Sequence, residues 1–458
     1  MNKKEATVTF CGGAMEPTGS NFLFTTPDTS ILIDCGLFQG EKILDAKNLA
    51  PFIYDPKKID VLFVTHAHLD HIGRIPKLVK EGFRGKIYST PPTKEITELL
   101  LQDSVRILTR QAMEQGVEPP YVEEDIFTIM DMWETVGYHK DIKVNDELSV
   151  KFFDSGHVLG SSMAQVSYGD KKMLFTGDLG NTPAPLLHDT EIPEDISYMV
   201  MESVYGDRNH EGKPMRREML RQVILDVIEK QGVLMIPVFS VERTQEMLFE
   251  LNHFVENDQI PLVPVFLDSP LAIKVTALYK KYQNYFNTTA TDIIKSGDDL
   301  FKFPMLRFME RREDSMKIGS VDGAKIIMAG SGMSNGGRII MHEKKYLPDP
   351  NNTLILAGYQ AVDTLGRKLQ DGAKTVVIDD EEVKVRAKIV TINGYSAHKD
   401  SDNLLAFVES IAEKGQLEKV FVAMGEPHSA LILSQKINDN VGSIATVAQE
   451  GKAVVLEF

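Results

Sequence analysis

Cysteine is scarce in this sequence, and long apolar runs are absent from it. The 458 residues include two cysteines, Cys11 and Cys35, which are too few for a disulfide framework or a cysteine-based zinc site. No stretch approaches the run of about 18 apolar residues that indicates a membrane span. The opening residues, MNKKEATVTF, have no apolar stretch of signal-peptide length. We therefore expect a protein of the reducing cytoplasm with no membrane partner.

Positive charge is also in short supply. Lys and Arg number 50 against 66 Asp and Glu, which gives a net charge of −16. This balance argues against a generally basic surface that coats nucleic acid. It leaves open a local basic groove, and bound metal ions would add positive charge where an acidic chain needs it.

Short strand-like runs alternate with helical stretches throughout the chain, which predicts an α/β protein. The length of 458 residues allows two or three domains. In Pro92–Gln115, apolar residues recur at spacings of three and four, which predicts a helix. We find no internal repeat and no low-complexity linker. The polar, turn-rich stretch Asp207–Pro214 is a candidate boundary between units.

Several unusual polar residues stand just after strand-like runs. His66 follows "VLFVT", His157 follows "KFFDSG", Asp178 ends "MLFTGD" and His398 follows "KIVTINGYSA". Loops at one edge of a sheet are where a rigid scaffold presents chemical groups. These positions are therefore candidates for a functional site.

Three of the 11 histidines lie within six residues, "HAHLDH". Imidazole and carboxylate are the usual nitrogen and oxygen ligands of zinc and its neighbours. If the run is extended, His66 and His68 project to the same side and can share an ion. The adjacent Asp70 and His71 diverge and more easily serve a second ion. Two ions about 3.5–4 Å apart would polarise a phosphate and generate a hydroxide.

Two residues further along the chain would complete such a site. Asp178, a lone carboxylate at a strand end, is suited to bridge two cations. His157 in "SGHVLGSS" would complete the ligand set of the first ion. Taken singly, a histidine is more commonly a hydrogen-bonded loop residue, and Asp178 an ordinary strand-end carboxylate. The pattern H-x-H-x-D-H after an apolar strand favours the metal site over that structural alternative.

These residues, with Asp34 in "LIDCG" before them, resemble in kind and order the motifs of the metallo-β-lactamase superfamily. The stretches "ESVYGDR", "IPVFSVERTQEML", "GSGMSNGGRI", "GYQAVDTLGRKL" and "GYSAHKD" resemble its β-CASP branch of nucleases, which includes the RNA 3′-end-processing endonuclease of the cleavage and polyadenylation machinery. The resemblance implies an α/β fold. An αββα metallo-β-lactamase sandwich, residues 1–206 and 391–458, would carry an inserted α/β β-CASP domain, residues 207–390.

The resemblance also implies two sets of metal ligands and a carboxylate that bridges them. Zinc is the expected ion, with manganese as the alternative. A further carboxylate would orient ligands from behind, as metal sites generally require. In order, these are His66, His68 and His157 for the first ion, Asp70 and His71 for the second, Asp178 as the bridge, and Asp34 as the orienting residue.

Glu202 and His398 match two further motifs of the branch. Phosphodiester cleavage must protonate the departing oxygen, and an imidazole kept charged by a carboxylate can supply that proton. Taken by itself, His398 would more often be a hydrogen-bonded loop histidine, but the surrounding "SAHKD" favours the catalytic role. Together with Asp70, this pair makes up the expected catalytic residues.

One position departs from the pattern of the branch. After "KVFVA", its RNA-cleaving members usually have a histidine that binds the second ion, and this chain has Met424. A thioether is a poor ligand for zinc or manganese. Three outcomes stay open: a weakened second site, replacement by another residue such as His428, or loss of activity. DNA-directed members of the branch have an aliphatic residue here, so DNA is the alternative substrate.

A glycine-rich turn, "GSGMSNGG", separates the apolar run "AKIIMA" from an expected helix that includes Arg338 and His342. Free backbone N–H groups at the start of a helix favour anions, and the resemblance makes this turn a candidate cradle for the RNA backbone. A plain tight turn is the alternative. The expected phosphate contacts are Ser331, Gly332, Arg338, Arg367 and Lys368.

The sequence thus predicts a dinuclear metal-dependent hydrolase, and the expected activity is internal cleavage of single-stranded RNA. Three alternatives are a catalytically impaired RNA-binding homologue, a hydrolase of small esters or thioesters, and a DNA nuclease. The expected partner is RNA, and a homodimer is left open.

Overall fold

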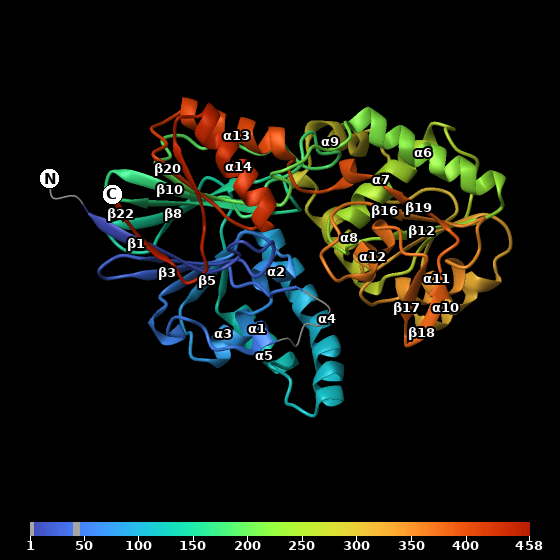
Figure 1. Ribbon diagram of the computed structural model, residues 1–458, viewed down its shortest axis with the longest axis horizontal. Helices are drawn as coiled ribbons and strands as arrows, with labels where there is room; N and C mark the ends of the chain where they lie inside the picture. Colours follow the sequence, from blue (N-terminus) through green and yellow to red (C-terminus); the bar gives the residue numbers. More distant parts are fainter. Residues whose placement is uncertain (1–3, 40–45) are drawn as a thin grey trace. The chain divides into compact units, whose positions relative to one another are not determined.

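A computed structural model describes residues 4–39 and 46–458 of the chain, which form two compact units. The first unit combines the described residues up to Ala184 with His188–Asn209 and His398–Phe458. The second combines Pro185–Leu187 with His210–Ala397, so it is inserted into the first along the chain (Figure 1). Within the described ranges, no helix is both long enough and apolar enough to cross a bilayer.

The first unit contains two seven-stranded sheets. In order across the first sheet, the strands are β22 (Ala453–Glu457), β1 (Glu5–Gly12), β2 (Asn21–Thr25), β3 (Ser30–Ile33), β4 (Val61–Phe63), β5 (Lys86–Ser89) and β6 (Trp133–Thr135). Across the second sheet they are β21 (Ile444–Val447), β20 (Lys419–Val422), β11 (Tyr198–Met201), β10 (Lys171–Phe175), β9 (Ser162–Tyr168), β8 (Leu148–Asp154) and β7 (Asp141–Lys143).

The main core of this unit lies between the two sheets. Phe22 of β2 stacks on Phe175 of β10, and Phe63 of β4 meets Phe152 of β8 edge-on, with ring centroids 6.1 Å apart in both pairs. Every second residue of β8 is buried, which is the period of a strand with one face in a core. Aromatic side chains from both sheets therefore join the sheets into one body.

Helices cover the outer faces of both sheets (Figure 1). On the second sheet, α13 (Ser401–Glu413) and α14 (Pro427–Asn440) pack Phe407 and Leu433 into one buried cluster with Met199 and Val420. The order helix, sheet, sheet, helix is the αββα sandwich that the sequence predicts. The remaining helices of the unit are α1 (Ala46–Leu49), α2 (Leu69–Ile72), α3 (Ile75–Lys80), α4 (Pro91–Gln115) and α5 (Glu123–Asp131).

The second unit is built on a six-stranded sheet in which every pairing is parallel. Every residue of its strands β12 (Val233–Pro237) and β15 (Lys325–Ala329) is buried, as expected for a parallel sheet covered on both faces. The other strands of this sheet are β14 (Leu306–Phe308), β13 (Val265–Leu267), β16 (Thr353–Leu356) and β19 (Lys388–Thr391), and a separate hairpin has β17 (Thr375–Ile378) and β18 (Glu381–Lys384).

Helices of the second unit are interleaved with these strands along the chain. This alternation gives the α/β unit that the sequence predicts. The helices are α6 (Lys213–Glu229), α7 (Arg243–Glu256), α8 (Pro270–Lys281), α9 (Thr288–Lys295), α10 (Arg312–Lys317), α11 (Ile339–Tyr346) and α12 (Leu365–Gln370). Short 3-10 helices of the chain span Pro56–Lys58, Gln283–Tyr285, Ile318–Ser320 and Asn393–Tyr395.

Truncating one aromatic ring between the sheets should destabilise the first unit. Phe152 is fully buried, so Phe152→Ala is expected to lower the free energy of unfolding by about 3–5 kcal/mol. Phe127→Ala is the matched control, because Phe127 is 55% exposed and its loss should change stability by about 0.5 kcal/mol or less. Urea unfolding followed by circular dichroism measures both. Equal effects of the two variants would contradict a core between the sheets.

Candidate metal centre

The candidate metal ligands lie at one edge of the first unit, beyond the carboxyl ends of strands that run in the same direction. In the first sheet, β3 and β4 pair in parallel, and Asp34 and His66 follow them. In the second sheet, β10 and β11 pair in parallel, and β8 has the direction of β10 because both pair antiparallel with β9. His157, Asp178 and Glu202 follow β8, β10 and β11 within three residues. Strand direction therefore brings these side chains together.

Four of these side chains offer ligand atoms to one point. One atom each of His66, His68, His157 and Asp178 lies within 4.8 Å of the other three. Nδ1 of His68 lies 3.1 Å from Nε2 of His66 and 3.2 Å from Nε2 of His157. Oδ2 of Asp178 lies 3.4 Å from Nε2 of both His66 and His157. A tetrahedral zinc ion with bonds of about 2.0–2.1 Å separates its ligand atoms by about 3.3 Å, so this set fits a divalent ion.

The other carboxylate oxygen of Asp178 faces a different imidazole. Oδ1 lies 3.4 Å from Nε2 of His71, which stands on α2 beside Asp70. The carboxylate of Asp70 accepts a long hydrogen bond of 3.4 Å from Nε2 of Gln39, and burial raises its pKa. Asp178 thus presents one oxygen to His66 and the other to His71, as a carboxylate between two ions would.

Burial makes several of these imidazoles neutral. It lowers the pKa of His66, and it lowers the pKa values of His68 and His157 well below their usual range. A neutral imidazole has a free lone pair, and this is the form that binds a metal. Burial opposes the charge of Asp178, but positive neighbours, His71 foremost, outweigh it and hold the pKa of this carboxyl well below its usual range. The cluster therefore combines neutral nitrogen ligands with one charged oxygen ligand.

Asp34 is fixed at the centre of a small polar network behind these ligands. It is fully buried and adopts a φ of +60°. Its Oδ1 accepts the N–H of Thr65 at 2.8 Å, and its Oδ2 accepts the hydroxyls of Thr65 at 2.8 Å and Ser20 at 3.2 Å. The same Oδ2 lies 2.7 Å from Nδ1 of His71. This contact assigns Nδ1 of His71 to Asp34 and leaves Nε2 to face Asp178.

Glu202 and His398 form a pair beside the cluster. Nδ1 of His398 lies 3.1 Å and 3.2 Å from the two carboxylate oxygens of Glu202, and the N–H of Leu179 donates to the same carboxylate at 2.6 Å. The ring of His398 lies 4.6 Å from that of His157. Burial opposes the charge of His398, but Glu202 and Asp178 outweigh it and raise its pKa to about 9. These two carboxylates therefore favour the protonated form of His398.

Residues that the sequence did not single out hold the backbone of the site segments in place. The hydroxyl of Ser161 accepts the N–H of His157 at 3.0 Å. Lys399 donates its N–H to the carbonyl of Leu179 at 2.9 Å and its Nζ to that of Gly180 at 2.8 Å, which fastens the segment of His398 to the loop after β10. Ser161 and Lys399 stand within the stretches "GHVLGSS" and "GYSAHKD", but their contacts emerge only once the loops are folded.

The residues expected to contact phosphate lie in the second unit, where several have internal partners. Arg338 precedes α11 rather than lying on it, so that expectation was wrong by one residue. Its guanidinium donates to Asp268 at 2.7 Å and to the carbonyl of Met309 at 2.6 Å, and Arg367 pairs with Asp371 at 3.1 Å. A phosphate at Arg338 would compete with Asp268. Phosphate contacts of Ser331, Gly332, Arg338, Arg367 and Lys368 stay a prediction.

Comparisons with known proteins identify the family. A model of the metallo-beta-lactamase superfamily matches residues 16–214, one of the Beta-Casp domain matches residues 244–369, and one of a Zn-dependent metallo-hydrolase RNA specificity domain matches residues 382–448. Ribonuclease TTHA0252 of Thermus thermophilus is 35% identical over 423 residues, which are 91% of this chain and 94% of that protein. The chain belongs to the β-CASP branch of the metallo-β-lactamase superfamily.

Other relatives of this β-CASP chain cover most of its length. An RNase J-like protein of Methanocaldococcus jannaschii is 32% identical over 433 residues, 93% of this chain and 94% of its own. Transcription termination factor FttA of Methanosarcina mazei is 30% identical over 447 residues, 94% of this chain and 68% of its own.

Similarity to a solved structure supports the fold, and the fold only. A protein of unknown function from Enterococcus faecalis V583 matches with a TM-score of 0.57 at 15% identity, covering 99% of this chain and 100% of that one. The predicted family and fold are therefore confirmed, as is the prediction of a metal-dependent hydrolase.

Weakening the network behind the ligands should loosen metal binding without removing a ligand. Asparagine tolerates the left-handed backbone of Asp34, but Asp34→Asn removes a negative charge and an acceptor beside His71. We expect metal affinity to fall by about 10–100-fold, measured by competition with a chromogenic chelator. Asp60→Asn, which alters an exposed acceptor for the N–H of Ser30, is the control. Unchanged affinity in Asp34→Asn would show that Asp34 does not orient a ligand.

Proposed function

We propose that this β-CASP chain is an endoribonuclease that cuts single-stranded RNA by metal-dependent hydrolysis. The observation that carries the proposal is a cluster of three histidines and Asp178, whose ligand atoms converge, next to His398, whose Nδ1 faces the carboxylate of Glu202. Hydrolysis of a phosphodiester needs a cation at the phosphate and an acid at the leaving oxygen. Two relatives, a ribonuclease and an RNase J-like protein, support RNA as the substrate. So does the RNA specificity domain matched at residues 382–448.

In this proposal, the buried cluster holds two divalent ions. When bound, the ions would supply Lewis acidity at the scissile phosphate and lower the pKa of water. Zinc is favoured at the first position because three of the four candidate ligands there are imidazoles, whereas manganese prefers oxygen ligands in an octahedron. The ligands would be His66, His68 and His157 for one ion, Asp70 and His71 for the other, and Asp178 between them.

His398 would act as the general acid. Its Nδ1 faces Glu202, and its other ring nitrogen, Nε2, would donate a proton to the departing oxygen. Glu202 keeps the imidazole charged between turnovers, and the N–H of Leu179 keeps Glu202 in place. The pair would therefore convert a poor alkoxide leaving group into an alcohol.

Met424 is the residue that would weaken binding of the second ion. It follows β20, the neighbour of β11 in the second sheet, and its side chain is 1% exposed in the core between the sheets. Its N–H donates to the carbonyl of Gly13 at 2.6 Å. A buried thioether at this edge of the sheet offers no nitrogen or oxygen to a cation, so we propose weaker retention of the second ion than of the first.

The test of the proposal is cleavage of matched single-stranded RNA and DNA oligonucleotides by the metal-loaded protein. We expect products of internal RNA cleavage and slower cleavage of DNA. His66→Ala should lose both cleavage activities together with the bound metal. Faster cleavage of DNA would overturn the RNA assignment. Hydrolysis of a thioester in preference to bis-p-nitrophenyl phosphate would overturn the nuclease assignment altogether.

Removing the general acid should slow the cleavage of each substrate in proportion to how much its leaving group needs a proton. We expect His398→Asn to lower kcat on RNA by about 10²–10⁴-fold at unchanged metal content. Hydrolysis of bis-p-nitrophenyl phosphate should fall far less, because nitrophenolate departs without a proton. His139→Asn is the matched control, since His139 also contacts a carboxylate, Glu191 at 2.9 Å, but is exposed. Equal losses on both substrates would contradict an acid role for His398.

Replacing the thioether should strengthen the second site. Met424 has a φ of +46°, a backbone conformation in which histidine is among the enriched residues. We expect Met424→His to retain more metal per chain than the wild type after dialysis against a weak chelator, measured by atomic emission. Met424→Leu, which adds no ligand atom, should behave as the wild type. If Met424→His retains no more metal than Met424→Leu, residue 424 does not reach the second site.

A further inference from the structure

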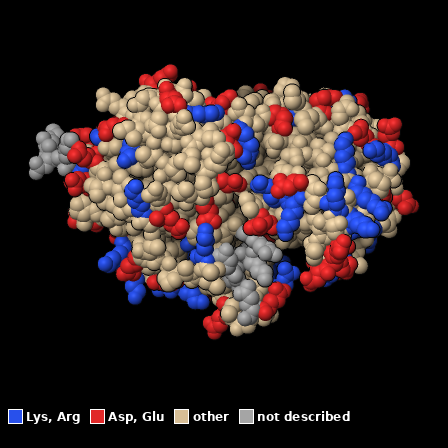
Figure 2. All heavy atoms as spheres, in the orientation of Figure 1, with Lys and Arg blue, Asp and Glu red and all other residues tan. Residues whose placement is uncertain are grey.

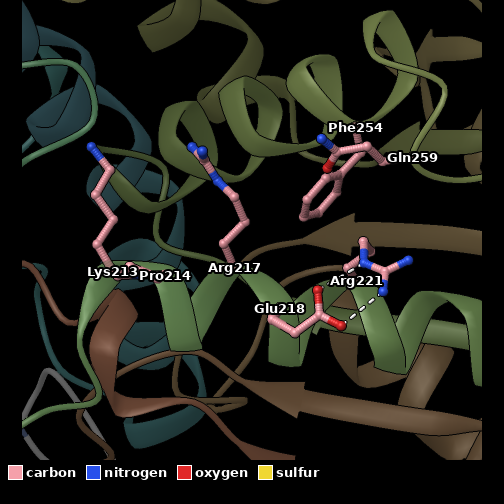
Figure 3. Close-up of a pocket in the computed structure, with 7 residues that line it drawn as sticks. All are labelled: Lys213, Pro214, Arg217, Glu218, Arg221, Phe254 and Gln259. Carbon is pink, nitrogen blue, oxygen red and sulfur yellow. Dashed lines mark hydrogen bonds and ion pairs between the residues drawn. The ribbon is translucent and has the colours of Figure 1, made fainter.

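The second unit contains a cavity of about 350 Å³ that the proposed chemistry does not use. Helices α6 and α7 contribute most of its wall (Figure 3). Its lining is mainly basic and polar, with one aromatic ring. The lining residues are Lys213, Pro214, Arg217, Glu218, Arg221, Phe254 and Gln259.

Three cations on this wall form a regular row along α6. Lys213, Arg217 and Arg221 recur every fourth residue, so they share one face of the helix at intervals of about 6 Å along its axis. Figure 3 shows all three rising from the same helix beside the cavity. We refer to these residues as the α6 basic row. In a chain with a net charge of −16, such a row is a marked local excess of positive charge.

The carboxylates nearby only partly neutralise this row. Arg221 is paired with the exposed Glu218 at 2.8 Å, and Arg217 with the buried Glu250 at 2.5 Å. Within residues 4–39 and 46–458, no carboxylate pairs with Lys213. Lys213 is half-buried, and its pKa is lowered by burial and by the like charges of neighbouring arginines. Among the described residues, this end of the row therefore forms no ion pair, although Glu250 and Glu246 lie close enough to act on the charge of Lys213.

A neighbouring arginine adds to the positive charge. Arg216 is 3% exposed, and in the described part of the chain its Nε and one of its Nη atoms have no hydrogen-bond acceptor. The first turn of α6 contains no acidic residue, and its N-cap, Gly212, has no side chain to accept a hydrogen bond. The positive end of the helix dipole thus adds to the charge of Lys213 and Arg216.

We propose that the α6 basic row binds the sugar–phosphate backbone of single-stranded RNA, an inference that rests on the proposed ribonuclease function. Evenly spaced cations suit a polymer that has one negative charge in every unit. Arginine side chains match phosphate oxygens with two parallel donors, and at Arg221 a phosphate would compete with the exposed carboxylate of Glu218 for both of them. The buried ring of Phe254 keeps one wall apolar, which strengthens charge interactions beside it. The row contacts backbone rather than base edges, so it adds affinity without sequence preference.

The test compares two double variants of equal charge. Lys213→Gln/Arg221→Gln removes both ends of the row but leaves Arg217, whose loss would strand the buried charge of Glu250. Lys295→Gln/Lys317→Gln is the control, since both lysines are exposed in the same unit and pair with acids three residues away. Both are made in an Asp178→Asn background to block hydrolysis. Binding of a fluorescent single-stranded RNA is measured by polarisation across a range of salt concentrations, and thermal unfolding checks the fold.

We expect the row variant to bind RNA about tenfold more weakly and to reduce the slope of log affinity against log salt by about 1.4, the value for two lost phosphate contacts. The control should match the parent. Equal affinity in the row variant and the parent, equal losses in both variants, or no RNA binding by the parent would each overturn the inference. Binding of fluorescent poly-glutamate is measured in the same way, and its loss in the row variant with RNA binding intact would assign the row to an acidic protein instead. Cleavage by the wild type tests the ribonuclease proposal separately.

Discussion

The carboxylate of Asp178 lies between imidazoles that come from two different sheets, and the metal centre depends on that position. His66 and His71 follow a strand of the first sheet, whereas His157 and Asp178 follow strands of the second. Their nitrogen–oxygen separations of 3.4 Å hold only if the sheets keep a constant separation at this edge. The aromatic core between the sheets provides that separation, so packing far from the ligands determines ligand geometry.

The site also requires close approach between the backbone of the loop after β3 and that of α2. A side chain at Gly36 would place its Cβ 1.5 Å from the carbonyl oxygen of Asp70, so only glycine lets the loop after β3 lie against α2, the helix that contains Asp70 and His71. The same loop places the buried carboxylate of Asp34 against His71. Burial would normally leave that imidazole neutral, but Asp178 and Asp34 together raise its pKa well above the usual range. The site thus balances buried charges against one another.

The inserted unit separates the parts of the site along the chain but not in space. Glu202 and His398 are 196 residues apart in sequence, and His398 is the first residue of the segment that returns to the first unit. A bridge between Gly180 and His398, together with the bonds of Lys399, joins that segment to the loop that contains Asp178. On the second unit, acidic and basic side chains intermingle over the face drawn in Figure 2. The α6 basic row therefore stands out by its spacing rather than by the overall charge of the unit.

Local patterns were enough to predict the helix of Pro92–Gln115 and the α/β class, and to single out "HAHLDH" as candidate metal ligands, because each depends on residues close in sequence. The order of motifs was enough to predict the family. Local patterns could not tell which oxygen of Asp178 faces which histidine, that Ser161 holds His157, or that Arg338 is engaged by Asp268. These contacts join segments far apart in the chain, and they form only when strand order and loop packing bring the segments together.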